Sequence, residues 1–298
     1  MSRAPQGGGQ VYRGRAHLDI QVVTSALPRV FDEQIIHMKL QDLHLAAAIL
    51  WQNWIQSTRI DELPAHCRPN DRAEAYAIQA ELARLSGQAA IGWKIAATSL
   101  VGQAHIGVDG PLAGRLLSKR VLEGGADISL AGNLMQVAEA EFAFRFGKSL
   151  PKRDRPYGVE EVLEAVESLH PAIEIPDSRY HDFARVGAPQ LIADNACACW
   201  FVLGAATRAN WRGQDLMKRK VMAYRNGMLM AEGSGANVLG DPRIALAWMA
   251  NELRAFGDGL LAGEVVTTGT CIKPMQIAPG DQIRVDFGAF GSIEAAFS

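Results

Sequence analysis

The segment from Val137 to Phe146 has the most informative pattern of acidic residues in the sequence, VAEAEFAFRF. Side chains alternate between the two faces of a β-strand. The even positions of this segment are all apolar, whereas Glu139, Glu141 and Arg145 share the odd positions. Carboxylates two residues apart on a strand start roughly 6.5–7 Å apart at the backbone, so their oxygens can converge on one ion. Because Mg²⁺ and similar cations take oxygen ligands, the pattern predicts a metal site. The alternative is a solvent-exposed strand face.

A third glutamate and a lysine extend this hypothesis. Glu174 interrupts the apolar run 172–175, and an acid in an apolar strand is costly to bury unless it is paired or bound to metal. Its alternative is an edge strand that leaves the carboxylate in water. Lys94 lies in GWKIAATS, just before the hydroxyls of Thr98 and Ser99. A desolvated lysine can handle protons, and the alternative is a surface lysine with its stem along apolar residues.

The elements that must position these residues are predicted from periodicity and capping. Helices are expected from about residue 38 to 54, between Asp71 and Gly87, from Gly158 to His170, and between Asp241 and Gly257. Strands are expected over 92–97, 135–146, 172–175, 198–203, 221–225, 228–232, 265–270 and 282–287. Asn226-Gly227 is the strongest hairpin signal. Strands and helices do not alternate regularly, which disfavours a doubly wound parallel fold.

The predicted fold is therefore of the α+β class, with a strand-rich core, covering helices and a small helical N-terminal part. We expect a flexible extension over 1–37, a helical region over 38–90 and a metal-binding, β-rich catalytic domain over 91–298.

Composition narrows the class of protein. The chain has 298 residues, 30 Lys+Arg against 32 Asp+Glu, and a net charge of −2, which argues against binding nucleic acid through a basic surface. No apolar run reaches the ~18–20 residues of a membrane span, and no glycine-rich nucleotide motif is present. Cys67, Cys197, Cys199 and Cys271 are expected to be reduced thiols of a cytoplasmic protein, because no secretory signal precedes them.

Several motifs follow one another in a fixed order: GWKIAATS, GVDGPLAGRLL, AEAEFAF, PAIEIPDSR, ADNACA and a closing Gly-Asp-x-Ile…Gly-Ser-Ile turn. From about Leu40 to Phe297 this order resembles the 2-hydroxypenta-2,4-dienoate (2-oxopent-4-enoate) hydratases and their sister 4-oxalocrotonate decarboxylases, in the fumarylacetoacetate hydrolase superfamily. The resemblance implies a mixed β-sandwich or roll core, like the C-terminal domain of fumarylacetoacetate hydrolase, with Mg²⁺ or Mn²⁺ held by three carboxylates.

Carried over by position, the resemblance assigns the metal ligands to Glu139, Glu141 and Glu174 and the lysine beside the 2-oxo acid to Lys94. Five further residues are expected near the substrate: Thr98, Ser99, Asp194, Asn195 and Thr270.

The function implied is a cytoplasmic hydro-lyase of aromatic-compound catabolism. It would add water to a 2-hydroxy-2,4-dienoate and give a 4-hydroxy-2-oxo acid. The alternatives are a 2-oxo acid decarboxylase, an acylpyruvate C–C hydrolase and a non-catalytic partner subunit of such an enzyme. A homo-oligomer, possible association with a decarboxylase, and no nucleic-acid or membrane partner are also expected.

One position departs from the family pattern. Many hydratases of this family read G-V-D-x-P-D, but Leu112 stands where the final acid would be, after Gly107-Val-Asp109-Gly-Pro111. The loss of that acid predicts slower hydration and a preference for substrates with a bulkier apolar tail.

Overall fold

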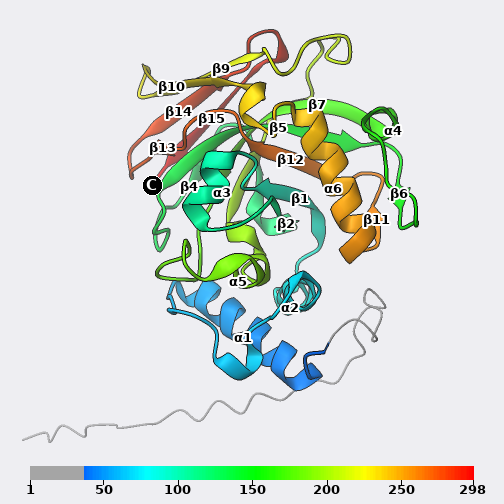
Figure 1. Ribbon diagram of the computed structural model, residues 1–298. Helices are drawn as coiled ribbons and strands as arrows, with labels where there is room; N and C mark the ends of the chain where they lie inside the picture. Colours follow the sequence, from blue (N-terminus) through cyan, green and yellow to red (C-terminus); the bar gives the residue numbers. More distant parts are fainter. Residues whose placement is uncertain (1–36) are drawn as a thin grey trace, which may run out of the picture.

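The computed structural model describes residues 37–298 (Figure 1), so the expected N-terminal extension lies outside the described residues apart from its last position. Two helices come first, α1 (Leu40–Gln56) and α2 (Arg72–Leu85), and both confirm the sequence prediction. Apolar side chains of α1 at helical spacing are buried: Leu43, Ala46, Ala47, Leu50 and Trp54. Asp71 caps α2 by accepting a hydrogen bond from the Glu74 amide at 2.9 Å, and the Glu74 carboxylate turns back to the Asn70 amide at 2.8 Å.

A large mixed sheet forms the centre of the molecule. Its strands are ordered β2 (Leu112–Leu117), β1 (Ala90–Ala96), β12 (Val265–Thr270), β5 (Val137–Phe146), β7 (Val166–Ile175), β8 (Trp200–Leu203) and β3 (Val121–Glu123), with β13 (Met275–Gln276) beside β5. The two edge strands β2 and β3 are consecutive in the chain and are separated only by the turn 118–120. The sheet must therefore curl until its edges come close together, which encloses one of its faces.

A second, five-stranded sheet packs against the outside of this curl (Figure 1). Its order is β10 (Met228–Ser234), β9 (Lys220–Arg225), β14 (Gln282–Asp286), β15 (Ser292–Phe297) and β4 (Ala126–Ile128). The predicted hairpin at Asn226-Gly227 joins β9 to β10, and both of its residues have positive φ. Phe142 of β5 meets Phe287 and Phe290 at ring-centroid distances of 5.1 and 6.2 Å. The even-numbered, apolar face of β5 thus forms the core between the sheets, as predicted.

Four helices and a small ribbon complete the fold. They are α3 (Leu100–Ile106), α4 (Val159–Ala165), α5 (Gly187–Ala193), α6 (Pro242–Phe256) and the pair β6 (Leu150–Pro151) with β11 (Gly259–Leu260). The prediction of α6 is confirmed, including its cap: the Asp241 carboxylate accepts from the Arg243 amide at 2.9 Å. The mixture of helices and strands confirms the α+β class. No helix among residues 37–298 is long and apolar enough to cross a membrane.

The predicted helix over 158–170 is wrong in its second half. The helix ends at Ala165, and Val166 begins strand β7, which runs to Ile175. The apolar residues of 159–169 do satisfy helical spacing, but pairing with β5 from Val166 onward supplies a long ladder of backbone hydrogen bonds. Tertiary pairing outweighs local periodicity here. The sequence prediction also missed α3, α5, β2, β15 and the short strands β3, β4, β6, β11 and β13.

Candidate metal and active site

Three glutamates meet on the enclosed face of the curled sheet. β5 and β7 are antiparallel neighbours, and their register places Glu139 directly opposite Glu174. Glu141 follows two residues along β5 on the same face. One carboxylate oxygen from each of the three residues lies within 4.8 Å of the others. The structure thus brings together the three ligands that the sequence predicted, from two strands far apart in the chain.

Two of the three carboxylates are buried, Glu139 is half-buried, and the cluster is only partly hydrogen-bonded. Glu141 and Glu174 are 0% and 1% exposed, which excludes the alternatives of a solvated strand face and an edge strand. One Glu141 oxygen, Oε2, accepts from the Thr267 hydroxyl and from the Gly269 amide, the latter at 2.8 Å. Its other oxygen, Oε1, and Oε2 of Glu174 have no hydrogen-bond partner among residues 37–298. Buried oxygens without donors are the condition that a bound cation relieves.

The electrostatics of the cluster point the same way. Burial, with the neighbouring Glu174 charge, raises the pKa of Glu139 to about 7, although Lys94 opposes the shift. Burial and the charges of Glu174 and Glu139 raise the pKa of Glu141 well above its usual range. Three carboxylates at this spacing cannot all be ionised at neutral pH without a compensating charge. An all-oxygen site of this kind fits a hard divalent cation.

Lys94 supplies one positive charge beside the cluster. Its ammonium nitrogen lies 2.9 Å from Oε1 of Glu174 and donates to the Ala196 carbonyl at 2.9 Å. The residue is 2% exposed, so the surface-lysine alternative is excluded. Burial alone would lower the pKa of Lys94, but the charges of Glu174 and Glu139 outweigh it and raise that pKa. Lys94 is therefore a charged group facing the same enclosed space as the glutamates.

A strained loop presents that carbonyl to Lys94. Asn195, Ala196 and Cys197 all have positive φ, at 56°, 50° and 60°, a run that non-glycine residues rarely adopt. The Asn195 side chain fixes the loop by accepting from the Arg115 amide at 2.6 Å and donating to the Arg115 carbonyl at 2.9 Å. Asn195 thus joins the loop to β2 through both the oxygen and the nitrogen of its side-chain amide.

The other predicted substrate residues fall into two groups. Thr98 and Thr270 border the cluster: a Cβ at Gly269 would lie 2.0 Å from the Thr98 hydroxyl, and Thr270 is paired with Glu141. Asp194 and Ser99 are engaged elsewhere. The Asp194 carboxylate accepts from Ser178, from the Arg179 amide and from the Arg179 guanidinium. The Ser99 hydroxyl caps α3 by accepting from the Gly102 amide at 3.0 Å.

Two residues of the site were not singled out from the sequence. Thr267 binds Glu141 and could have been found from the alternation VVTTGT, which places it on the same face of β12 as Val265. Arg179 is 1% exposed and holds both the side chain and the backbone carbonyl of Asp194. Its position in PDSR gave no periodic signal, because it follows the end of β7.

Leu112 is the first residue of β2 and lies opposite Ala96. It is 1% exposed and belongs to the main hydrophobic core. It does not line the cleft that reaches Glu174. The predicted preference for a bulky apolar tail therefore gains no support from this position and stays a prediction.

The fold and the three-glutamate cluster together define a family. Residues 117–298 match the fumarylacetoacetate (FAA) hydrolase C-terminal family, and the chain belongs to it. The chain is 34% identical to a 2-keto-4-pentenoate hydratase of Paraburkholderia xenovorans over 75% of its length and 83% of that protein. It is 32% identical to a 4-oxalocrotonate decarboxylase of Pseudomonas putida over 76% of its length and 85% of that protein.

A solved structure gives the same answer for the fold. The 4-oxalocrotonate decarboxylase from Pseudomonas putida G7, complexed with magnesium and adipate, superposes with a TM-score of 0.79 at 27% identity. The match covers 87% of this chain and 98% of that chain. The resemblance inferred from the motifs is confirmed.

Proposed function

We propose that this protein is a metal-dependent hydro-lyase that adds water to a 2-hydroxy-2,4-dienoate and gives a 4-hydroxy-2-oxo acid, in the catabolism of aromatic compounds. The observation that carries the proposal is the buried cluster of Glu139, Glu141 and Glu174 with Lys94 beside it. Relatives support the proposal as well. Several of them are named as hydratases of such acids, including a 2-hydroxyhexa-2,4-dienoate hydratase of Comamonas testosteroni at 35% identity.

The residues of the site suit this chemistry. A divalent cation held by the three glutamates would supply Lewis-acid polarisation of the substrate oxygens. Lys94 is positioned by the Ala196 carbonyl and by Glu174, so its ammonium can hold or deliver a proton at the oxygen of the 2-oxo group. The enclosed face of the curled sheet limits the access of bulk water, which strengthens each of these interactions.

The second candidate is decarboxylation of a 2-oxo acid. It is favoured by the decarboxylase names among the relatives and by the TM-score of 0.79 to a decarboxylase. Both reactions need the same stabilisation of charge on a 2-oxo acid, so the glutamates and Lys94 serve either one. The two reactions differ at the end of the substrate away from the 2-oxo acid, which gains water in hydration and loses CO₂ in decarboxylation.

The finer assignments belong to the same proposal. We propose Mg²⁺ or Mn²⁺ as the metal, because all three side chains offer oxygen ligands. We propose a cytoplasmic homo-oligomer, able to associate with a decarboxylase, that binds neither nucleic acid nor membranes. The four cysteines are free thiols, which is consistent with a reducing compartment.

The test is a direct assay of the purified chain with Mg²⁺ or Mn²⁺. 2-Hydroxypenta-2,4-dienoate should lose its ultraviolet absorbance, while 4-oxalocrotonate assayed in parallel should release little CO₂. Glu141→Gln is the control and should show neither reaction. Rapid CO₂ release with no loss of the dienoate would assign the decarboxylase instead, and no turnover of either compound would refute both candidates.

A further inference from the structure

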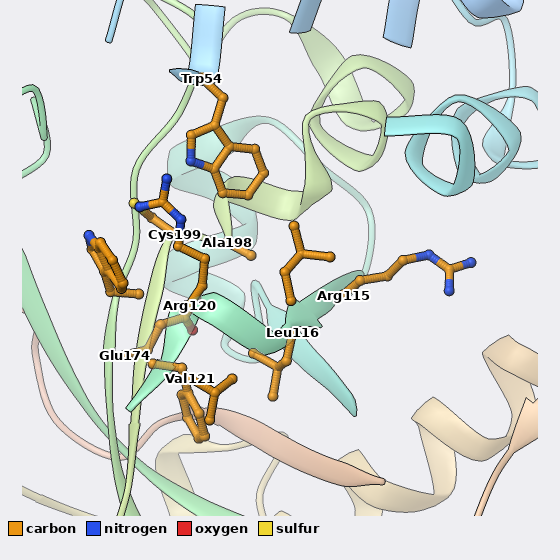
Figure 2. Close-up of a pocket in the computed structure, with 11 residues that line it drawn as sticks. Trp54, Arg115, Leu116, Arg120, Val121, Glu174, Ala198 and Cys199 are labelled. Carbon is orange, nitrogen blue, oxygen red and sulfur yellow. The ribbon is translucent and has the colours of Figure 1, made fainter. Parts of the chain in front are cut away.

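A small cavity beside α1 contains more positive charge than the structure compensates. We call it the arginine pocket: a cavity of about 50 Å³ whose polar lining includes Trp54, Arg59, Arg120, Asp177 and Arg179. It shares Trp54, Arg120, Cys199 and Trp200 with a narrow cleft that reaches Glu174 (Figure 2). The pocket and the cleft thus share part of one wall, and Glu174 lines the cleft on its other side.

The arginines of this pocket are not equally paired. Arg59 forms an ion pair with Asp177, and Arg179 forms one with Asp194. Arg120 has no hydrogen bond and no acidic partner within the part of the chain that the structure describes, residues 37–298. Its guanidinium lies 4.3 Å from the ring centroid of Trp200 and 5.6 Å from that of Trp54. Two of the three arginines are thus paired with aspartates, and the uncompensated charge is that of Arg120.

Figure 2 shows how Arg120 is directed. Its guanidinium points toward Trp54 and Cys199, whereas that of Arg115 points away from the pocket. Burial and the nearby Arg179 charge lower the pKa of Arg120. A half-buried cation with no counter-ion is unfavourable, and a bound anion would relieve it.

Two further donors around the same pocket have no acceptor. The indole Nε1 of Trp54 is buried without a hydrogen-bond partner among the described residues, and so is Nε of Arg59. The side chain of Arg59 is only 3% exposed. Both groups can only donate. A ligand that presents acceptor oxygens would satisfy both hydrogens.

The size and shape of the pocket select the anion. A cavity holds a water molecule when it offers about 10–15 Å³ to a water-sized probe, so a cavity of about 50 Å³ has room for a planar carboxylate group. Indole rings near the guanidinium of Arg120 leave room for a flat ligand at the edge of that guanidinium. Guanidinium groups pair with carboxylates through two parallel hydrogen bonds.

We propose that the arginine pocket is a carboxylate-binding site, separate from the three glutamates, in which Arg120, Trp54 Nε1 and Arg59 Nε are the donors. The carboxylate can come from the far end of a dicarboxylic substrate held at the glutamates, or from a free carboxylic acid. The first source rests on the proposed function, whereas the second does not.

The binding test uses the full chain, freed of metal by treatment with a chelator and dialysis, and isothermal titration calorimetry with acetate, glutarate and inorganic phosphate. The parent should bind acetate or glutarate saturably. Arg120→Gln should raise the dissociation constant at least about tenfold, because a charge-assisted pair is lost. Trp54→Phe, which removes only the N–H, should raise it less, and Arg120→Lys should retain part of the affinity.

The matched control is Arg185→Gln, since the side chain of Arg185 is 87% exposed and pairs with the exposed Asp182. It should bind like the parent. Unchanged Mg²⁺ binding by Arg120→Gln shows that the variant is folded. Equal carboxylate binding by the parent and Arg120→Gln, no carboxylate binding by the parent, or binding of phosphate alone would each overturn the proposal.

Steady-state kinetics then distinguish the two sources. If the substrate supplies the carboxylate, Arg120→Gln should raise KM for a dicarboxylic 2-oxo-4-enoate at least about tenfold and leave KM for 2-oxopent-4-enoate unchanged. If a free acid supplies it, the ratio of the two KM values should stay as in the parent while acetate binding is lost. Lack of turnover by the parent would refute the proposed function but leave the calorimetric result intact.

Discussion

Lys94 has two contacts of different kinds at the residue scale. The Ala196 carbonyl is a fixed neutral acceptor, whereas Glu174 is a carboxylate that also faces Glu139 and Glu141. A cation bound by the glutamates would share Glu174 with Lys94, and the carbonyl would still hold the ammonium in place. The lysine can therefore act on the substrate without being a determinant of metal affinity.

The first prediction follows from this separation. Lys94→Ala should lower kcat by roughly 10²–10⁴-fold, the usual contribution of a positioned proton donor or acceptor. Its Mg²⁺ affinity should not weaken, because Glu174 loses a competing cation. Stopped-flow or steady-state assays and calorimetry measure the two effects. The exposed Lys119→Ala is the control, and an unchanged kcat in Lys94→Ala would remove the lysine from the mechanism.

The glutamates give a second prediction. Glu141→Gln should abolish detectable Mg²⁺ and Mn²⁺ binding in calorimetry, because an amide cannot replace the charge of a buried carboxylate. Its thermal midpoint without metal should be equal or higher, since the pKa of Glu141 is raised by burial and the charged form is unfavourable. Glu139→Gln and Glu174→Gln should likewise abolish detectable metal binding. Glu232→Gln, exposed on β10, should bind metal normally; metal binding by all three site variants would place the metal elsewhere.

At the scale of elements, the site depends on a close approach of β2 to the loop 195–197. A Cβ on Gly114 would lie 2.2 Å from the Asn195 carbonyl oxygen, so only glycine lets β2 and the loop meet. The same contact orients Ala196 toward Lys94. β2 thus holds the strained loop in place through the close approach of Gly114 and through the hydrogen bonds between Asn195 and Arg115.

Gly114→Ala should therefore destabilise the protein by about 2–4 kcal/mol, because backbone atoms must move to admit the methyl group. It should also lower kcat, since Ala196 would be displaced from Lys94. Denaturant unfolding and the hydration assay test both effects. Gly110→Ala is the matched control: nothing lies within 4 Å of its Cβ position, and its stability should change by less than about 0.5 kcal/mol. Equal stability of the two variants would contradict the close approach.

These elements also explain what the sequence could and could not predict. The glutamates of β5 were found because one face of the strand is wholly apolar, which makes the period of two visible, and α2 and α6 were found because their caps are local. β7 was divided between helix and strand because its ladder with β5 depends on residues about 30 positions away. The same reason explains two contacts that the sequence could not predict. Arg179 pairs with Asp194 and Arg115 hydrogen-bonds to Asn195 only in the tertiary structure.

At the scale of the whole molecule, curling of the sheet has an energetic consequence. It encloses three carboxylates that the folded chain compensates with one lysine. The folded state without metal therefore holds acidic groups in a less favourable setting than the unfolded chain does, and metal binding is linked to stability. pH should reveal this link, because protons and metal compete for the same oxygens.

The last prediction concerns the pH dependence of stability. Glu139 has a folded-state pKa of about 7 against an ordinary value of 4.5, so between these pH values the folded chain binds more protons than the unfolded chain. Its contribution to stability is thus fully present below pH 4.5 and is lost as the pH rises through about 7. Without metal, thermal unfolding should occur at a higher temperature at pH 6 than at pH 8. Saturating Mg²⁺ should reverse this order, because it needs deprotonated carboxylates.

Glu139→Gln isolates the effect from other titrating groups. Burial lowers the pKa of the His170 imidazole, which acts in the opposite direction in both proteins, so the difference between parent and variant reports on Glu139. The variant should unfold with a flatter pH dependence between 6 and 8, whereas Glu232→Gln should follow the parent. Calorimetric scans in metal-free buffer measure these midpoints. Identical slopes for the parent and Glu139→Gln would mean that the carboxylate is ionised in the folded chain, and that the enclosed face of the sheet already compensates its charge without metal.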